Sequence, residues 1–226
     1  MSIKSVLQKI TPQRVTSEVF PIDGSHDLFD TEESCIRNAV PLRQDEFAAG
    51  RAAARAALKT LGISPQSIPR AKDRCPIWPK GIVGSISHSE GFAAALVGHS
   101  ADIAGIGLDI EGADALKDDL HKYILTPREI YERDARPMVA GSPRCKVTFV
   151  AKEALFKAVY PITRTFFGFQ DARVEIYEDE YWDSAFVNSA FGLPSGLTIC
   201  RGNWSAVGNL IIATVCVKGT QERRPN

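Results

Sequence analysis

The stretch that decides the fold of this chain reads GIGLDIE and covers residues 105–111. Hydrophobic residues alternate with small or acidic ones, so the pattern predicts a β-strand with Gly105, Gly107, Asp109 and Glu111 on one face. The two glycines predict a place where a ligand backbone or a phosphate comes close to the carboxylates. Paired carboxylates are typical ligands for a hard cation such as Mg²⁺, and the alternative is a solvated strand end.

The composition limits the class of protein. The chain has 226 residues, of which 44% are hydrophobic and 24% charged, as in globular proteins. Lys plus Arg equals Asp plus Glu at 27 each, so any anion site is local, and we expect no nucleic-acid partner. Five cysteines without a Cys-x-x-Cys pair favour reduced thiols. With no apolar run of signal-peptide or membrane-spanning length, we expect a cytoplasmic protein without a membrane span. We also expect a monomer.

The positions of glycine and proline predict where the helices, strands and loops begin and end. Residues 1–40 are expected to form strands and loops, and a helix over 45–61 ends at Gly62. Thr126 and Glu129 form a capping box that starts a helix, and a second helix over 147–160 stops at Pro161. The expected strands are 82–87, 92–97, 103–111, 174–176, 197–201 and 210–217. This order, strands with one long helix and then the same again, predicts two α+β halves that meet near residue 104.

The helix predicted over 147–160 carries three charges on an otherwise apolar surface. At about 100° per residue, Lys152 falls inside the apolar arc, and Glu153 and Lys157 lie together at its edge. Buried charges need partners, so the three residues favour a pocket for a metal and an anionic ligand. The alternative is a Glu153–Lys157 ion pair on the helix surface, with the Lys152 side chain extended to solvent.

Upstream of the acidic strand, GSISHS at residues 84–89 combines hydroxyl groups with an imidazole. These donors suit a phosphate, whereas a purely structural role for His88 is the alternative. No serine here has the glycine spacing of a nucleophile elbow. The chain also contains neither a Walker A loop nor a Gly-x-Gly-x-x-Gly motif.

Basic residues provide possible anchors for a phosphorylated ligand. Arg43 lies just before the helix over 45–61, Arg51 lies on it, and a cluster follows in the loop at 70–74. Arg55 and Lys59 continue the spacing of Arg51 along the helix and are expected to be solvated.

Four motifs taken in order resemble the 4'-phosphopantetheinyl transferases, and most closely the surfactin-type branch that includes enterobactin synthase component D. The motifs are RCPIWP at 74–79, GSISHS at 84–89, IGLDIE at 106–111 and FVAKEALFK at 149–157. The resemblance implies a pseudo-dimer of two similar α+β subdomains, each an antiparallel sheet with a long helix. It implies that residues 1–104 anchor coenzyme A, that residues 105–226 bind Mg²⁺ and carry catalysis, and that the active site lies in the cleft between them.

The resemblance also implies a reaction: transfer of the phosphopantetheine arm of coenzyme A to a serine of an apo acyl or peptidyl carrier protein, releasing adenosine 3',5'-bisphosphate. Such transfer serves siderophore, nonribosomal peptide, polyketide or fatty acid biosynthesis. The implied ligands of Mg²⁺, or of Mn²⁺ in its place, are Asp109, Glu111 and Glu153. Glu153 is the implied general base, and Lys152 and Lys157 stabilise the phosphates.

The remaining implied contacts involve the nucleotide and the carrier. His88, Ser87, Arg43 and Arg51 hold the 3'-phosphate end of coenzyme A. The loop at 70–76 covers the adenine, and the region 112–146 docks the carrier protein. The loop residues implied in coenzyme A binding are Arg70, Lys72, Arg74 and Pro76. Two alternatives stay open: an Mg²⁺-dependent nucleotidyl transferase and a coenzyme A-binding module without activity.

Overall fold

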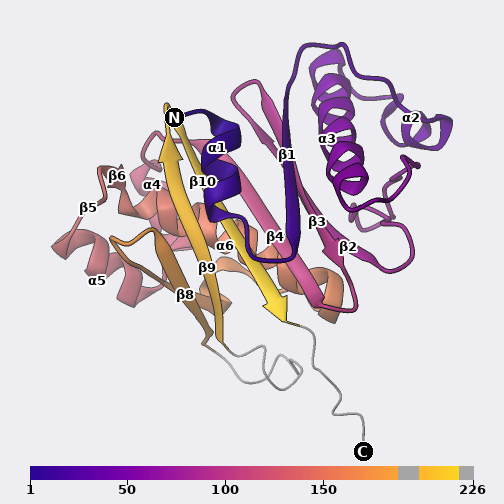
Figure 1. Cartoon of the computed structure of the whole chain (residues 1–226). Helices are drawn as coiled ribbons and strands as arrows, with labels where there is room; N and C mark the ends of the chain where they lie inside the picture. The colour runs from indigo at the N-terminus through magenta and orange to yellow at the C-terminus, as the bar shows by residue number, and fades with distance from the viewer. Residues whose placement is uncertain (188–198, 219–226) are drawn as a thin grey trace, which may run out of the picture.

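The computed structural model describes residues 1–187 and 199–218 and has an α+β fold with antiparallel sheets (Figure 1). Within these residues one sheet has the strand order β1-β3-β2, and a larger one has the order β4-β10-β9-β8-β7. The α+β class predicted from the sequence is confirmed. The strands of the first sheet are β1 (Val15–Pro21), β2 (Ile82–Ser89) and β3 (Phe92–His99). Those of the second are β4 (Ile103–Gly112), β7 (Ala172–Ile176), β8 (Tyr181–Phe186), β9 (Ile199–Val207) and β10 (Leu210–Lys218).

A 20-residue helix packs against each sheet. The first, α3 (Pro41–Thr60), buries an alanine-rich face that includes Ala53 and Ala57 against Val97 of β3. The second, α6 (Arg144–Thr163), lies behind β4 and β10 in Figure 1 and buries Ala154 and Leu155 in a core that contains two tryptophans. Small residues on both helices allow close approach, because their side chains add little bulk between helix and sheet.

The glycines of β4 show how close the second helix lies. A Cβ atom built on Gly107 would lie 1.8 Å from the carbonyl oxygen of Ala154, and one built on Gly105 would lie 2.3 Å from that of Ala158. The expectation that these glycines make room for a ligand is therefore wrong, since the backbone of α6 fills the space. The predicted alternation itself holds, and it directs Asp109 and Glu111 toward the same side of the strand as α6.

The two sheets meet along β2 and β4, where side chains replace the usual backbone ladder. Leu108 N donates to Ser85 Oγ at 3.0 Å, and Ile110 N donates to Ser87 Oγ at 3.2 Å. Both serines are buried. The serines therefore join the first half of the chain to the strand that carries the acidic residues.

The N-terminal region differs most from expectation. Residues 1–40 form helix α1 (Ile3–Ile10), strand β1 and helix α2 (Asp30–Ile36), where strands and loops were expected. Helix α1 packs Val6, Leu7 and Ile10 against the apolar face of β4 and its neighbours. Its apolar residues lie at helical spacing, which predicts a helix. The prolines and glycines elsewhere in residues 1–40 outweighed this pattern in the prediction.

The predicted capping box is confirmed, because Glu129 N donates to Thr126 Oγ1 and Thr126 N donates to Glu129 Oε2. It begins α5 (Pro127–Ala135), which follows α4 (Asp118–Ile124).

The expected stop at Pro161 is wrong: α6 continues to Thr163 and ends where Arg164 adopts φ 53°. A proline this close to the helix end removes only one backbone bond. Short elements complete the chain: β5 (Met138–Val139), β6 (Ser142–Pro143) and the 3₁₀ helix η1 (Phe169–Asp171).

Two remaining expectations concern the closing strands and membranes. The strand expected over 197–201 begins at Ile199, and its first two positions lie outside the described residues. Strand β8 was not predicted. In the ranges 1–187 and 199–218, none of the helices has the length and apolar character needed to cross a membrane.

Candidate active site

Asp109 and Lys157 form the centre of the candidate site. Asp109 lies on β4 and is 3% exposed, and Lys157 Nζ donates to its Oδ1 at 2.7 Å. Ser87 Oγ donates to the same oxygen at 3.0 Å and accepts from Lys157 Nζ at 3.0 Å. Three elements, β2, β4 and α6, thus meet at one carboxylate oxygen. Lys157 pairs across the fold rather than with Glu153 on its own helix, where the alternative interpretation placed it.

The second oxygen of this carboxylate lacks any such support. Asp109 Oδ2 is buried and has no hydrogen-bond partner among the described residues. A buried carboxylate oxygen without a partner is costly, so its presence in a fold calls for an explanation such as a bound ion or a catalytic role. This atom is therefore an acceptor that a further ligand beside Asp109 could use.

Glu111 and Glu153 lie near enough to Asp109 to respond to its charge. Burial, followed by the charge of Asp109, raises the pKa of Glu153 above its usual value. The same two causes in the same order raise the pKa of Glu111. Lys146 offsets part of this effect at Glu111, since its Nζ lies 3.5 Å from Glu111 Oε2. A cation placed between these three carboxylates would offset their mutual repulsion.

The oxygen-only donor set of these carboxylates fits a hard divalent ion. The geometry is not that of a finished metal site, because no group of three or more His, Cys, Asp or Glu side chains in the described part of the chain is arranged to hold a metal ion. At Asp109, Lys157 occupies Oδ1 and only Oδ2 is available. The residues fit the ion in type and charge, and its binding would require the side chains to adjust.

His88 and Arg43 lie together on the side of the first half. The guanidinium of Arg43 donates to His88 Nε2 and, at 2.9 Å, to Glu46 Oε2. Because a guanidinium can only donate, His88 Nε2 accepts, and the ring is neutral with its proton on Nδ1. Burial lowers the pKa of His88, and the charge of Arg43 lowers it further, while Glu46 opposes both.

Arg51 is 5% exposed, which is unusual for a residue expected to meet a phosphate. Its Nε donates to the carbonyl oxygen of Ile68 at 2.6 Å, and its guanidinium lies 3.9 Å from the centre of the Phe47 ring. Burial lowers its pKa to about 10. In this structure Arg51 supports the chain that leads into the loop at 70–76.

The loop at 70–76 is tied to both halves. Arg70 pairs with Pro76 in an isolated β-bridge, and its guanidinium donates to the carbonyl oxygen of Cys35 at 2.8 Å. Asp73 forms an ion pair with Arg164, just beyond α6. Lys72 and Arg74 are exposed. Of the expected basic residues in this loop, these two are the ones with side chains open to solvent.

Lys152 requires a correction. The prediction that its ammonium contacts phosphates is wrong for this structure, and so is the alternative that it extends to solvent. Its side chain is 2% exposed, and all three donors are used: by Glu129 Oε2 at 2.7 Å, by the carbonyl oxygen of Ile124 at 2.8 Å and by that of Phe169 at 2.7 Å. The charge predicted to face a ligand belongs to a closed internal cluster.

Sequence reasoning also missed an apolar pocket beside Glu153. Its volume is about 170 Å³, and phenylalanine rings and the turn at Gly168 form its walls. The sequence FFGF at 166–169 was the available signal, because large apolar side chains gathered close together mark interaction sites or ligand-binding grooves. The lining residues are Lys152, Glu153, Phe156, Phe166, Phe167, Gly168, Phe169 and Ala172.

Comparison with known proteins gives a consistent result. Residues 31–98 match the model of the 4'-phosphopantetheinyl transferase N-terminal domain, and residues 105–195 match that of the 4'-phosphopantetheinyl transferase superfamily. The chain is similar to 4'-phosphopantetheinyl transferase PptT of Mycobacterium tuberculosis, with 34% identity over 81% of this chain and 83% of that protein. Svp of Streptomyces mobaraensis, also named as a 4'-phosphopantetheinyl transferase, is 32% identical over 90% and 85%.

Two further comparisons cover less of the chain. Enterobactin synthase component D of Escherichia coli is 36% identical over 54% of this chain and 58% of that protein. Among solved structures, holo-[acyl-carrier-protein] synthase of Thermotoga maritima aligns with a TM-score of 0.38 and 16% identity, over 52% of this chain and 65% of that one.

Proposed function

This chain belongs to the 4'-phosphopantetheinyl transferase superfamily, and from that premise we propose how its own residues carry out the transfer. The donor is coenzyme A and the acceptor is a serine of an apo carrier protein. The serine oxygen forms a bond to the β-phosphorus, the bond from that phosphorus to the oxygen of the α-phosphate breaks, and adenosine 3',5'-bisphosphate leaves. The observation that carries the proposal is the buried, unpartnered Asp109 Oδ2 beside two carboxylates of raised pKa.

Glu153 is the proposed general base. Burial, followed by the charge of Asp109, raises the pKa of Glu153 above its usual value, and a higher pKa makes the carboxylate a stronger base. Glu153 would accept the proton of the serine hydroxyl as the new bond forms. The same three carboxylates, Asp109, Glu111 and Glu153, would hold Mg²⁺, which when bound neutralises the charge of the pyrophosphate.

Lys157 is the proposed phosphate contact on the protein. An ammonium has three donors, and Asp109 and Ser87 use two of them. The third is available to a phosphate oxygen. Because the other two bonds fix the ammonium before the substrate arrives, Lys157 would need little reorganisation during the transfer.

The nucleotide end of coenzyme A is proposed to lie against the first half of the chain. Arg43 and His88 would bind the 3'-phosphate, since both are close together and Arg43 is partly exposed. Arg51 would act one step away by holding Ile68 and with it the approach to the loop at 70–76. This assigns coenzyme A anchoring to residues 1–104 and chemistry to residues 105–226.

The apolar pocket is proposed to take the pantetheine arm. It adjoins Glu153, so an arm attached to the β-phosphate could enter it while the phosphates stay beside Lys157. The carrier protein would approach from the region 112–146, which contains α4 and α5. We further propose that the protein acts as a cytoplasmic monomer.

Intact-mass spectrometry of an apo carrier protein, incubated with this chain, coenzyme A and Mg²⁺, tests the proposal. The expected result is a gain of one phosphopantetheine on the carrier serine together with adenosine 3',5'-bisphosphate in solution. Pyrophosphate release from a nucleoside triphosphate would support the nucleotidyl transferase instead. Coenzyme A binding without any change in carrier mass would indicate a binding module.

A further inference from the structure

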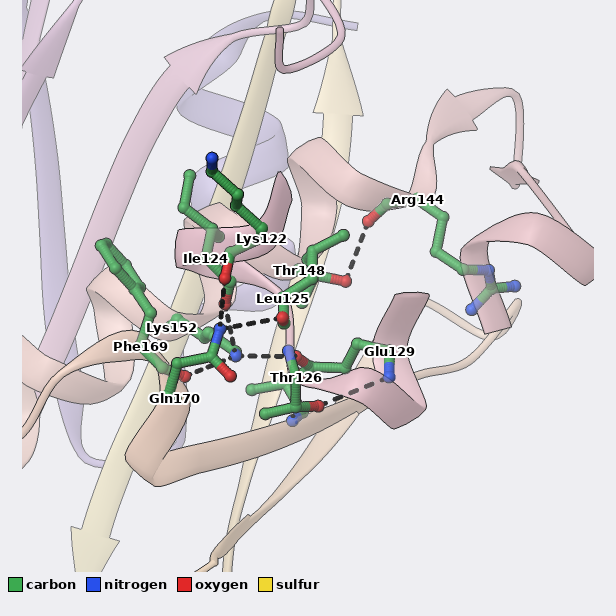
Figure 2. Close-up of polar contacts among 11 residues, drawn as sticks. Lys122, Ile124, Leu125, Thr126, Glu129, Arg144, Thr148, Lys152, Phe169 and Gln170 are labelled. Carbon is green, nitrogen blue, oxygen red and sulfur yellow. Dashed lines mark hydrogen bonds and ion pairs between the residues drawn. The ribbon is translucent and has the colours of Figure 1, made fainter. Parts of the chain in front are cut away.

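Lys152 is the centre of a cluster that joins four elements. Figure 2 shows its ammonium, which comes from α6, between the end of α4, the start of α5 and the 3₁₀ helix η1. Glu129 extends the cluster, because its Oε1 accepts from Val174 N of β7 at 2.7 Å while its Oε2 binds Lys152 and Thr126 N. Every donor of the lysine is thereby satisfied, and both carboxylate oxygens are used.

The same cluster forms part of the apolar pocket. Lys152 lines the pocket, and its ammonium holds the carbonyl of Phe169, which lies on the pocket wall opposite α6. A second tie acts on that wall: Gln170 Nε2 donates to the carbonyl oxygen of Leu125 at 2.9 Å, as Figure 2 also shows. The wall at 166–169, which Gln170 directly follows in the chain, therefore depends on α4 and α6 for its position.

We propose that Lys152, with Glu129, is a positioning residue that fixes the wall of the pantetheine pocket, so that affinity for the pantetheine arm depends on it and affinity for the nucleotide does not. The inference rests on the proposed function of the pocket. It assigns the charge of Lys152 to holding protein carbonyls in place rather than to the phosphates of coenzyme A.

Two ligands separate these roles. Coenzyme A contains the nucleotide, both bridging phosphates and the pantetheine arm, whereas adenosine 3'-phosphate 5'-diphosphate contains all of these except the arm. If Lys152 bound phosphate, its loss would weaken both ligands. If it positions the pocket wall, its loss weakens coenzyme A alone.

The main variant is the double substitution Lys152→Met with Glu129→Gln, which removes the ion pair without leaving a buried charge unpaired. The second is Gln170→Ala, which removes a tie to the same wall from an exposed residue and avoids any risk to the buried ion pair. Lys59→Met is the matched control, because it makes the same lysine substitution at an exposed position on the other long helix.

Isothermal titration should show coenzyme A binding weakened by about tenfold in the double variant, and less in Gln170→Ala. Binding of adenosine 3'-phosphate 5'-diphosphate should stay within about twofold of wild type in both. In transfer assays the double variant should raise the KM for coenzyme A more than it lowers kcat.

Equal weakening of both ligands, or no weakening of coenzyme A in either variant, would overturn the inference. Failure of wild type to bind coenzyme A at all would instead overturn the proposed function, so the two failures are distinguishable.

Discussion

Two of the lysines of helix α6, Lys152 and Lys157, lie five residues apart and have opposite surroundings. Lys152 is 2% exposed and forms three hydrogen bonds in a cluster where both oxygens of its carboxylate partner are used. Lys157 is 29% exposed and meets a carboxylate whose second oxygen has no partner among the described residues. A buried charge alone therefore does not indicate function. The candidate site differs from the Lys152 cluster because one of its buried carboxylate oxygens, Asp109 Oδ2, has no hydrogen-bond partner among the described residues.

Glu153→Gln should have the largest effect on transfer. Removing the base should lower kcat by about 10²- to 10⁴-fold, while coenzyme A binding is retained. Stopped-flow or mass-spectrometric transfer assays would measure the rate, with Glu175→Gln as a control at an exposed strand position. A variant that modifies the carrier at the wild-type rate would show that Glu153 is not the base.

Lys152→Met should have the largest effect on stability. It leaves Glu129 buried and unpaired, which should lower the free energy of unfolding by about 3–5 kcal/mol. Adding Glu129→Gln should restore part of that loss, because no unpaired charge then remains. Urea denaturation followed by circular dichroism checks both. A double variant less stable than Lys152→Met would contradict the explanation.

Lys157→Met should have the opposite pattern to Lys152→Met, with a larger effect on the transfer rate and a smaller one on stability. Lys157 is partly exposed, and Ser87 still donates to Asp109 after the substitution, so the loss should disturb the fold less than Lys152→Met does. Loss of a positioned donor to the transferring phosphates should lower kcat by about 10²- to 10³-fold. If denaturation showed the larger loss of stability in Lys157→Met, the contrast between the two lysines would be wrong.

His88 should make coenzyme A recognition depend on pH. Burial holds its pKa below the usual 6.5, so as pH falls below 6.5 the unfolded chain gains a proton before the folded one, and stability is lost. A bound 3'-phosphate would favour the charged ring and raise that pKa. The preference for coenzyme A over dephospho-coenzyme A should therefore increase by roughly tenfold from pH 8 to pH 6.

His88→Ala provides the control for this effect, since it should make the preference nearly independent of pH. A wild-type preference that stays constant between pH 8 and pH 6 would argue against a 3'-phosphate at His88. Equal affinity for the two ligands at every pH would exclude the role altogether.

The sequence predicted those features that depend on local periodicity. Alternation along 105–111 placed Asp109 and Glu111 on one face, and helical spacing brought Glu153 and Lys157 to one edge of α6. The capping box of Thr126 and Glu129 was likewise predicted from a local pattern. Each of these follows from a period of two or about 3.6 residues, which the chain itself displays.

Features that depend on distant partners could not be read in the same way. Glu129, the partner of Lys152, lies 23 positions away, and its second role outside the capping box leaves no local signal. The glycines of β4 marked a close approach, but only the fold shows that α6 is what approaches. The position of Arg51 on its helix predicted a contact with phosphate, but its burial in the fold indicates a structural role.

The most direct test of the contrast is the rate of phosphopantetheine transfer to an apo carrier at saturating coenzyme A, measured by intact mass. Lys157→Met should be slow, because it lacks a group at the site of the chemistry. The double variant of Lys152→Met and Glu129→Gln should stay within about threefold of wild type, since saturation compensates for its weaker pocket. Equal rates in the two variants, or a slower double variant, would contradict the account.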